Sequence, residues 1–354
     1  MIHSPTDDLT RRSLLMHDKT DEAPQETAVT LVDVAVKAGV NKVTASIVLS
    51  GGSGNTRVSD ATRQRILKVA EELGYQPNAI ARSLRRRKTD IIGFYMSGYL
   101  DTRDLFLSEI SSGLHERCEH HNRDLLVHGR YRGLSADKIF AQLLNGKVDG
   151  LVLHVHSDEA LIGRLAASRL PVVAIANPVP DLPCVGVDDA EGSRLLVDHL
   201  AKQGHRCIHY ATSPFKLTST ERRFAAFQAA AAEAGIRLTS SHVGGDEQTL
   251  DSLDHAITPV RGERPTAIAC WNDSIAYRVV THLELRGLQV PGDIAVAGFD
   301  GYASPIPPAY RLTTVRAPWR EVAGIAVDVL AANDGKPNVG EIMLPVSLLT
   351  GDTA

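Results

Sequence analysis

The chain has 354 residues, 43% of them hydrophobic and 23% charged, with a net charge of −4. It contains no apolar stretch long enough to cross a bilayer, no apolar signal core near its N-terminus and no CxxC pairing among its four cysteines. We therefore expect a cytoplasmic protein of several domains, without a membrane span, a disulfide framework or a structural zinc site.

Charge is distributed unevenly along the chain. Residues 1–27 are polar, with 3 basic and 6 acidic side chains, and we expect them to form a disordered tail. Residues 28–90 hold 11 Lys and Arg against 5 Asp and Glu, a net charge of +6, so the other residues must carry −10 to give the total of −4. A basic module on an acidic body is the charge pattern of a domain that binds nucleic-acid phosphates.

Three short helices are predicted within residues 30–74. Apolar residues recur at helical spacing in the first segment, which ends at Gly39, and Asn41 can cap a second helix. Ser59 can cap a third helix, which runs to Gly74. Three helices around one small core form a helix-turn-helix unit. The alternative is a set of ordinary core helices, but the basic charge favours a DNA-binding module.

Short apolar runs alternate with amphipathic segments from residue 90 onward. The runs are IIGFYM, DLLVHG, GLVLHV, VVAIA, CIHYA, TAIAC and IAVAGF. Continuous apolar strands separated by helices indicate parallel sheets with helices on both faces. Ligands bind such sheets beyond the carboxyl ends of the strands. This rule points to Ser97, Asn177, the segment Trp271–Asp273 and Asp300.

Six segments, in a consistent order, resemble the lactose-repressor (LacI/GalR) family of bacterial transcription regulators. They are TLVDVAVKAGV, VSDATRQRILKVAEELGYQPNAIARSLR, HLAKQGHR, CWNDSIA, VAGFDGY and LTTVRAPWREVAGIAVDVL, and they cover about residues 30–354. The resemblance implies an all-α helix-turn-helix module followed by an α/β core of the type I periplasmic-binding-protein fold, with two Rossmann-like halves. It implies a sequence-specific DNA-binding regulator, which we expect to be a repressor, that is no enzyme and needs no cofactor.

The resemblance also sets the expected domain boundaries. They are 28–77 for the DNA-binding domain, 78–89 for a hinge helix and linker, about 90–188 plus 316–340 for the first half of the core, and about 189–315 plus 341–354 for the second half. In the family the hinge helix places Leu84 as a wedge in the minor groove. Such a short helix is unstable alone, so without DNA we expect a flexible linker.

The outer face of the second helix departs from the family pattern. Ile47 stands where relatives usually carry Arg, Ser50 where they carry Asn, and the loop GGSGNTR has three extra residues. We therefore expect Val43 and Ile47 to contact thymine methyl groups and Lys42 to contact a guanine or a phosphate. The expected DNA contacts are Thr30, Lys42, Val43, Thr44, Ser46, Ile47, Arg57, Asn78, Ala81, Arg82 and Leu84.

Three effector contacts are implied by the resemblance. The guanidinium of Arg223, the amide of Asn272 and the carboxylate of Asp300 together suit the vicinal hydroxyls of a sugar or sugar derivative. The full expected set is Ser97, Asn177, Arg223, Trp271, Asn272 and Asp300. The ring of Trp271 either stacks on a sugar or fills the core.

One departure leaves the effector class open. Many sugar-responsive relatives carry Asp where this chain has Ala176, so either the ligand has fewer hydroxyls or Asn177 or Asp188 substitutes for the missing acid. A purine or another small metabolite is the alternative, because the position of Arg223 serves anions in some relatives.

Two other classes of protein fit the sequence less well. His154 and His156 lie on one strand face and suggest a metal-dependent enzyme, but the sequence lacks a third ligand at a metal-site spacing, a P-loop and a GxSxG motif. A free solute-binding protein would need an export signal and no residues 30–90.

Double-stranded DNA, a small-molecule effector and a second copy of the chain are the expected partners. The resemblance implies a homodimer that contacts a pseudo-palindromic operator, with the segment SEISSGLHERCE in the dimer interface. Ligand in the cleft would rotate one half against the other and change the docking of the hinge helices. The chain ends without a heptad repeat, so we do not expect a coiled-coil tetramer.

Overall fold

The chain forms two compact units, Met1–Arg86 and Arg87–Ala354. The structure is a computed structural model. It describes residues 29–49, 58–97, 104–129, 133–155, 159–214, 217–244, 247–258, 264–302, 310–332 and 340–354. The predicted tail, the inserted loop with Arg57, and the positions Ser50 and His156 lie outside these residues.

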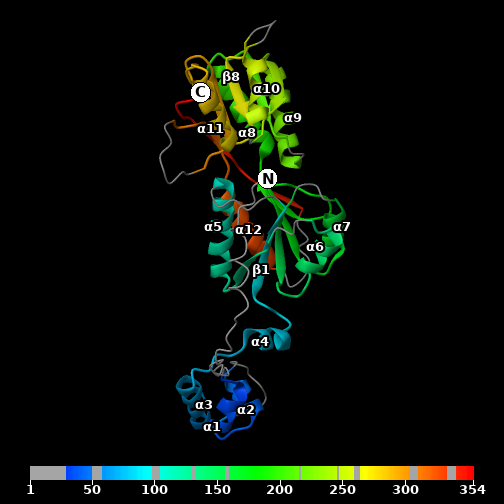
Figure 1. The fold of residues 1–354 in the computed structure, drawn as a ribbon, viewed down its shortest axis with the longest axis vertical. Helices are drawn as coiled ribbons and strands as arrows, with labels where there is room; N and C mark the ends of the chain where they lie inside the picture. Colours follow the sequence, from blue (N-terminus) through cyan, green and yellow to red (C-terminus); the bar gives the residue numbers. More distant parts are fainter. Residues whose placement is uncertain are drawn as a thin grey trace, which may run out of the picture. The chain divides into compact units, whose positions relative to one another are not determined.

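The first unit contains the predicted helices around one small core (Figure 1). Its helices are α1 (Leu31–Lys37), α2 (Lys42–Leu49), α3 (Asp60–Glu72) and α4 (Ala79–Arg86). The Asn41 side chain accepts from the backbone N–H of Thr44 at 2.7 Å, and the Ser59 hydroxyl accepts from that of Thr62 at 3.3 Å, so both predicted caps are confirmed. The apolar faces of α1, α2 and α3 meet in a cluster that includes Val34, Ala45 and Ile66, each 0% exposed.

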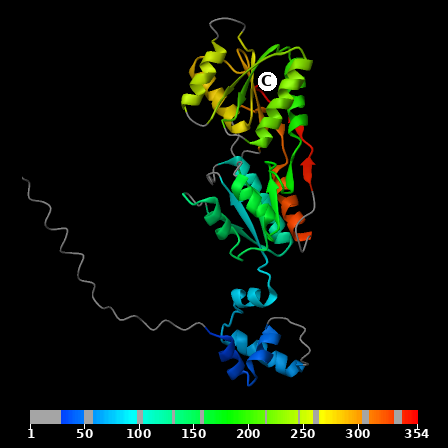
Figure 2. The same ribbon diagram turned by 90° about the vertical axis from the view of Figure 1, so that its right-hand side faces the viewer.

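The second unit contains two six-stranded sheets with helices on both faces (Figure 2). The first sheet has the order β11-β5-β4-β3-β1-β2 and the second β12-β10-β9-β8-β6-β7. The strands are β1 (Ile91–Met96), β2 (Asp124–Val127), β3 (Gly150–His154), β4 (Val172–Ile175), β5 (Cys184–Val187), β6 (Cys207–Thr212), β7 (Arg237–His242), β8 (Ala267–Cys270), β9 (Ala295–Asp300), β10 (Thr313–Arg316), β11 (Glu341–Leu344) and β12 (Ser347–Leu349). Within the described residues every pairing is parallel except that of β10 with β12.

Alternate side chains of the central strands point to opposite faces of each sheet. On the first sheet one face meets α5 and α12 and the other meets α6 and α7. On the second sheet one face meets α8 and α9 and the other meets α10 and α11. The helices are α5 (Leu105–His120), α6 (Ala136–Leu143), α7 (Glu159–Ala167), α8 (Asp189–Lys202), α9 (Thr218–Glu233), α10 (Glu247–Ile257), α11 (Asp273–Leu285) and α12 (Trp319–Ala332).

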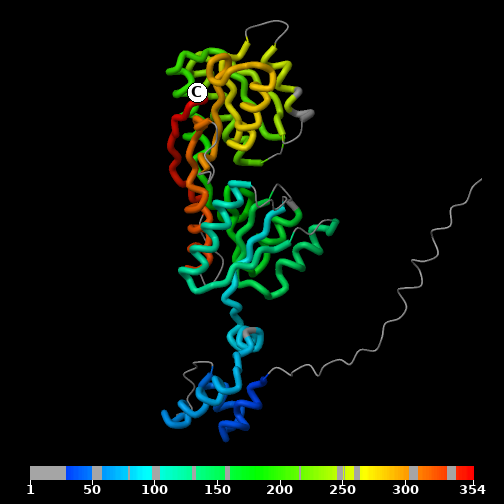
Figure 3. The backbone as a smooth tube through the Cα atoms, turned by 60° about the vertical axis from the view of Figure 1, so that its left-hand side comes forward, coloured from blue at the N-terminus to red at the C-terminus, as the bar shows by residue number. Residues whose placement is uncertain are grey.

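The chain passes between the two sheets three times, after β5, after β10 and after β11. The last passage is part of the C-terminal segment, which runs from one half to the other (red in Figure 3). Because β11 pairs with β5 in the first sheet, the predicted boundary at residue 340 is wrong, and the first half extends to Leu344. The strands β5, β7, β10, β11 and β12 are also absent from the predicted apolar runs.

Helices α5 and α12 lie against one another with unusually close backbones (Figure 1). A Cβ atom added at Gly113 of α5 would lie 2.1 Å from the carbonyl oxygen of Arg320 on α12. Only glycine fits at this contact without a shift of one helix.

We expect Gly113→Ala to lower the free energy of unfolding by about 1–3 kcal/mol, because either helix must move to admit the methyl group. Gly163→Ala is the matched control, since a Cβ there meets nothing within 4 Å and alanine favours the helix by about 0.5–1 kcal/mol. Urea unfolding followed by circular dichroism measures both. Equal stability of the two variants would contradict the close contact.

Candidate functional site

Arg223 on α9 lies at the centre of a buried network of polar side chains. It is 5% exposed. Its Nε donates to Asp189 at 2.7 Å, and its Nη1 donates to the carbonyl oxygen of Trp271 at 3.0 Å and lies 3.7 Å from Asp300. The guanidinium also stacks on the ring of Phe299, 3.7 Å from the centroid. These contacts hold the side chain at the carboxyl ends of β8 and β9.

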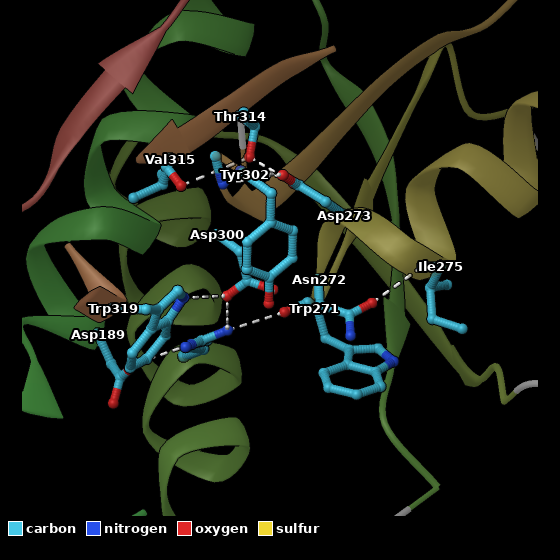
Figure 4. A network of polar contacts seen from close by, with 12 residues as sticks. Asp189, Trp271, Asn272, Asp273, Ile275, Asp300, Tyr302, Thr314, Val315 and Trp319 are labelled. Carbon is cyan, nitrogen blue, oxygen red and sulfur yellow. Dashed lines mark hydrogen bonds and ion pairs between the residues drawn. The ribbon is translucent and has the colours of Figure 1, made fainter. Parts of the chain in front are cut away.

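Asp300 ends β9 and is 4% exposed. Its Oδ1 accepts from the indole nitrogen of Trp319 at 3.1 Å, and its Oδ2 accepts from the hydroxyl of Tyr302 at 2.6 Å (Figure 4). Burial raises the pKa of Asp300 to about 7, although the positive charge of Arg223 acts to lower it. The backbone φ of Asp300 is 131°, a strained value for a residue with a side chain.

Asp273 supports the loop that carries Tyr302. Its Oδ2 accepts from the backbone N–H of Gly301 at 2.8 Å, and its Oδ1 accepts from the hydroxyl of Thr314 at 2.5 Å. Burial raises the pKa of Asp273 to about 6, with these hydrogen bonds acting to lower it. The neighbouring Asn272 caps α11, because its Oδ1 accepts from Ile275 N at 2.9 Å.

The first half of the core contributes Asn177, which is 2% exposed and touches both halves. Its Nδ2 donates to the carbonyl oxygen of Val155 at 2.9 Å, and its Oδ1 accepts from the backbone N–H of Ser219 on α9 at 3.3 Å. Ser97 follows β1, where its backbone N–H donates to the carbonyl of His154 at 3.1 Å. Asn177 is therefore joined to the helix of Arg223, whereas Ser97 lies at the end of the first sheet.

A cavity of about 790 Å³ lies along α5 and α12 and reaches this network at Asp300. Asp300, Tyr302 and Trp319 line it, together with side chains of α5 and α12. Of the six residues predicted to bind an effector, Asp300 alone is in its lining.

The structure corrects one sequence-based expectation and informs another. Asp188, named as a substitute for the missing acid at Ala176, is exposed and caps α8 through Glu191 N, and the acid that pairs with Arg223 is Asp189. The indole nitrogen of Trp271 donates to the carbonyl of Val243 at 3.3 Å, and its ring packs against two core clusters. These contacts favour the core-filling role for Trp271.

Asp189, Tyr302 and Trp319 are site residues that the sequence analysis missed. The pair Asp188–Asp189 directly follows an apolar run, which is a usable signal for a helix start at a strand end. Nothing local to the sequence indicates that Trp319 meets Asp300, because the two come together only through the passage after β10.

The predicted DNA contacts of the first unit lie on α1, α2 and α4. Val43 is 66% exposed and Leu84 76%, while Thr44, Ser46 and Ile47 are half-buried. Thr30 caps α1 in a capping box with Asp33, and the Asn78 side chain caps α4. The exposed remainder are Lys42, Ala81 and Arg82.

His154 has a structural environment in its half of the core. Its Nδ1 donates to the carbonyl of Ile175 at 3.1 Å, and its ring lies 5.2 Å from that of Phe106. In the part of the chain that the structure describes, no group of three or more His, Cys, Asp or Glu side chains is placed to hold a metal ion.

Each of the two units matches a known protein family. The model of bacterial regulatory proteins of the lacI family matches residues 30–78, and that of the periplasmic binding protein-like domain matches residues 197–354. The chain is 31% identical over 320 residues to the HTH-type transcriptional regulator GalR of Escherichia coli K12, which covers 87% of this chain and 90% of GalR. The chain belongs to the lacI family of bacterial regulatory proteins.

Further relatives agree with this assignment to the lacI family. The transcriptional repressor PurR of Photobacterium profundum is 31% identical over 315 residues, which are 85% of this chain and 90% of PurR. The lac repressor dimer bound to operator and the anti-inducer ONPF has a TM-score of 0.79 at 26% identity, and the match covers 92% of this chain and 99% of that one. The predicted family and fold class are thus confirmed. This chain is a DNA-binding transcriptional regulator, as are its relatives.

None of the described helices has the length and apolar character needed to cross a membrane.

We expect Asp300→Asn to change the pH dependence of stability. Because burial raises the pKa of Asp300 from 3.8 to about 7, its contribution to stability is present at low pH and is lost as the pH rises through 7. The variant should therefore gain stability relative to the wild type between pH 5 and 7.5, by up to about 1.4 kcal/mol per pH unit. Urea unfolding across this range measures the difference, with the exposed Asp188→Asn as control. A difference that does not vary with pH would contradict the burial argument.

Proposed function

We propose that this regulator is a repressor whose affinity for operator DNA is set by a small molecule bound between the two halves of its core. The observation that carries this proposal is Asn177, whose buried side chain is bonded to Val155 in one half and to Ser219 in the other. Rotation of one half against the other must make or break this contact. A ligand that favours one arrangement thereby shifts the equilibrium between the two.

A second contact joins α9 to the first half of the core. Arg222 on α9 makes two hydrogen bonds to Glu341 on β11, at 2.7 and 2.8 Å. The two side chains are 41% and 42% exposed, so water screens this pair and its free energy is small. Neighbouring residues of α9 thus contact the first half both in the interior and at the surface, and α9 is the element that carries Arg223.

The proposed effector is a sugar or sugar derivative. Asp300 is an acceptor at the wall of the cavity, and Nη1 of Arg223 lies 3.7 Å from its carboxylate. A sugar hydroxyl both donates and accepts, so a hydroxyl in the cavity can donate to Asp300. Trp319, which also lines the cavity, is 2% exposed and holds Asp300 in place through its indole nitrogen.

The proposed operator contacts involve an apolar recognition face. Val43 exposes 66% of its surface on α2, and an exposed valine gains free energy when a thymine methyl group covers it. Leu84 on α4 is 76% exposed and has the apolar surface that a minor-groove wedge requires. Lys42, Arg82 and the following arginines supply phosphate contacts.

We further propose that the regulator acts as a homodimer in the cytoplasm, where its DNA lies. The similar lac repressor is described as a dimer bound to operator. A twofold dimer matches a pseudo-palindromic site, and α5 is the segment that we assign to the interface.

Replacement of thymine by uracil in an operator selected from random duplexes should weaken binding about tenfold, because uracil lacks the methyl group that Val43 contacts. The variant Val43→Ala should lose this discrimination. Val36→Ala is the matched control, because Val36 is 75% exposed but lies on α1. Fluorescence anisotropy at fixed salt measures each affinity, and equal binding to thymine and uracil operators by the wild type would contradict the assignment.

A thermal-shift screen against sugars should find a ligand whose binding is at least tenfold weaker in Arg223→Lys, since lysine keeps the charge but lacks the planar donors. Arg222→Lys, one residue away and half-exposed, should bind normally. The ligand should change operator affinity by the same factor by which operator changes ligand affinity. A ligand that binds both variants equally well would contradict the proposed site.

A further inference from the structure

Buried acids outnumber buried bases at the effector site. Asp189, Asp273 and Asp300 are 6%, 3% and 4% exposed, and Arg223 is the guanidinium buried among them. The neighbouring Arg222 is paired with Glu341 at the surface, where that carboxylate balances its charge. With all groups ionised, these four side chains carry two more negative charges than positive ones.

The positive charge of Arg223 is already used by the protein. Its Nε is bonded to Asp189, its Nη1 contacts Trp271 and Asp300, and the face of the guanidinium covers Phe299. Asp189 and Asp300 already compensate the charge of Arg223, so an anionic ligand beside it adds a negative charge to a network that holds more acids than bases.

A ligand in the cavity would meet an acidic side chain of the network. Asp300 lines it, whereas Arg223 does not. Three arginines line it as well, but Glu109, Glu116 and Glu321 balance them, and Arg320 is bonded to Glu116 at 2.9 Å. Burial already raises the pKa of Asp300, so a second negative charge beside it is opposed further.

We infer, on the basis of the proposed function, that the site binds uncharged or amine-bearing polyhydroxy ligands and excludes phosphorylated and carboxylate-bearing ones, and that Asp189 sets this preference by neutralising Arg223. Hydroxyl groups in the cavity can donate to Asp300 without adding charge to the network. A protonated amine beside Asp300 reduces the excess of negative charge. Asp189 acts through Arg223 and is a positioning residue.

The test compares matched forms of the same hexose. Each hexose of a panel is presented as the free sugar, the 2-amino sugar, the 6-phosphate and the uronic acid, and affinities for the full-length protein are measured by isothermal titration calorimetry. For the hexose that binds, the free and amino forms should bind at least tenfold more tightly than the phosphate and the uronate, because like charges at close range oppose binding.

The variant Asp189→Asn should reduce the ratio of free-sugar to phosphate affinity at least tenfold, because it releases the charge of Arg223. Asp188→Asn is the matched control, since it removes the same charge one residue away at an exposed helix cap that asparagine also forms. A structural role of Asp189 would weaken all forms equally and leave the ratio unchanged, which would overturn its assignment.

The wild-type protein decides the charge preference even if Asp189→Asn fails to fold. A phosphate or uronate that binds as tightly as its parent sugar overturns the inference and leaves the proposed sugar effector intact. Failure of every form of every hexose to bind counts instead against the proposed function.

Discussion

The ion pairs of Arg223 are the interaction on which the architecture of the core depends. A buried guanidinium is tolerated only when its charge is compensated, and here Asp189, Asp300 and the carbonyl of Trp271 surround it. These partners come from the start of α8, the end of β9 and the end of β8. Arg223 therefore joins three elements of the second half at the edge that faces the first half, and a displacement of any of them must disturb its contacts.

The network extends into the first half through few residues. Trp319 begins α12, which packs on the first sheet, and its indole nitrogen donates to Asp300 of the second. Asn177 makes the corresponding contact from the end of β4 to α9. Because these contacts are hydrogen bonds at the ends of rigid elements, small rotations exchange them at moderate cost, whereas the sheets themselves resist deformation. The halves can thus move as bodies while each core remains packed.

The features that could be predicted from the sequence are those whose determining interactions are local. The caps at Asn41 and Ser59 depend on backbone groups three residues away, and the central strands are continuous apolar runs. Features that depend on pairing between distant segments of the chain could not be predicted. The four residues of β11 carry a weak pattern, and their place beside β5 is set by a contact between segments more than 150 residues apart. The choice between Asp188 and Asp189 could not be made either, because one residue along a helix start turns the side chain from solvent to the interior.

In the proposed mechanism, a contiguous route leads from the effector site to the segment assigned to the dimer interface. A ligand in the cavity touches Asp300, Tyr302 and Trp319, and Trp319 is the first residue of α12. The next residue, Arg320, places its carbonyl against Gly113 of α5, so close that no side chain fits between them. A shift of α12 on ligand binding must therefore be followed by α5. In a dimer that uses α5, such a shift changes the relation between the two subunits, and with it the spacing of the two DNA-binding units that must match one operator.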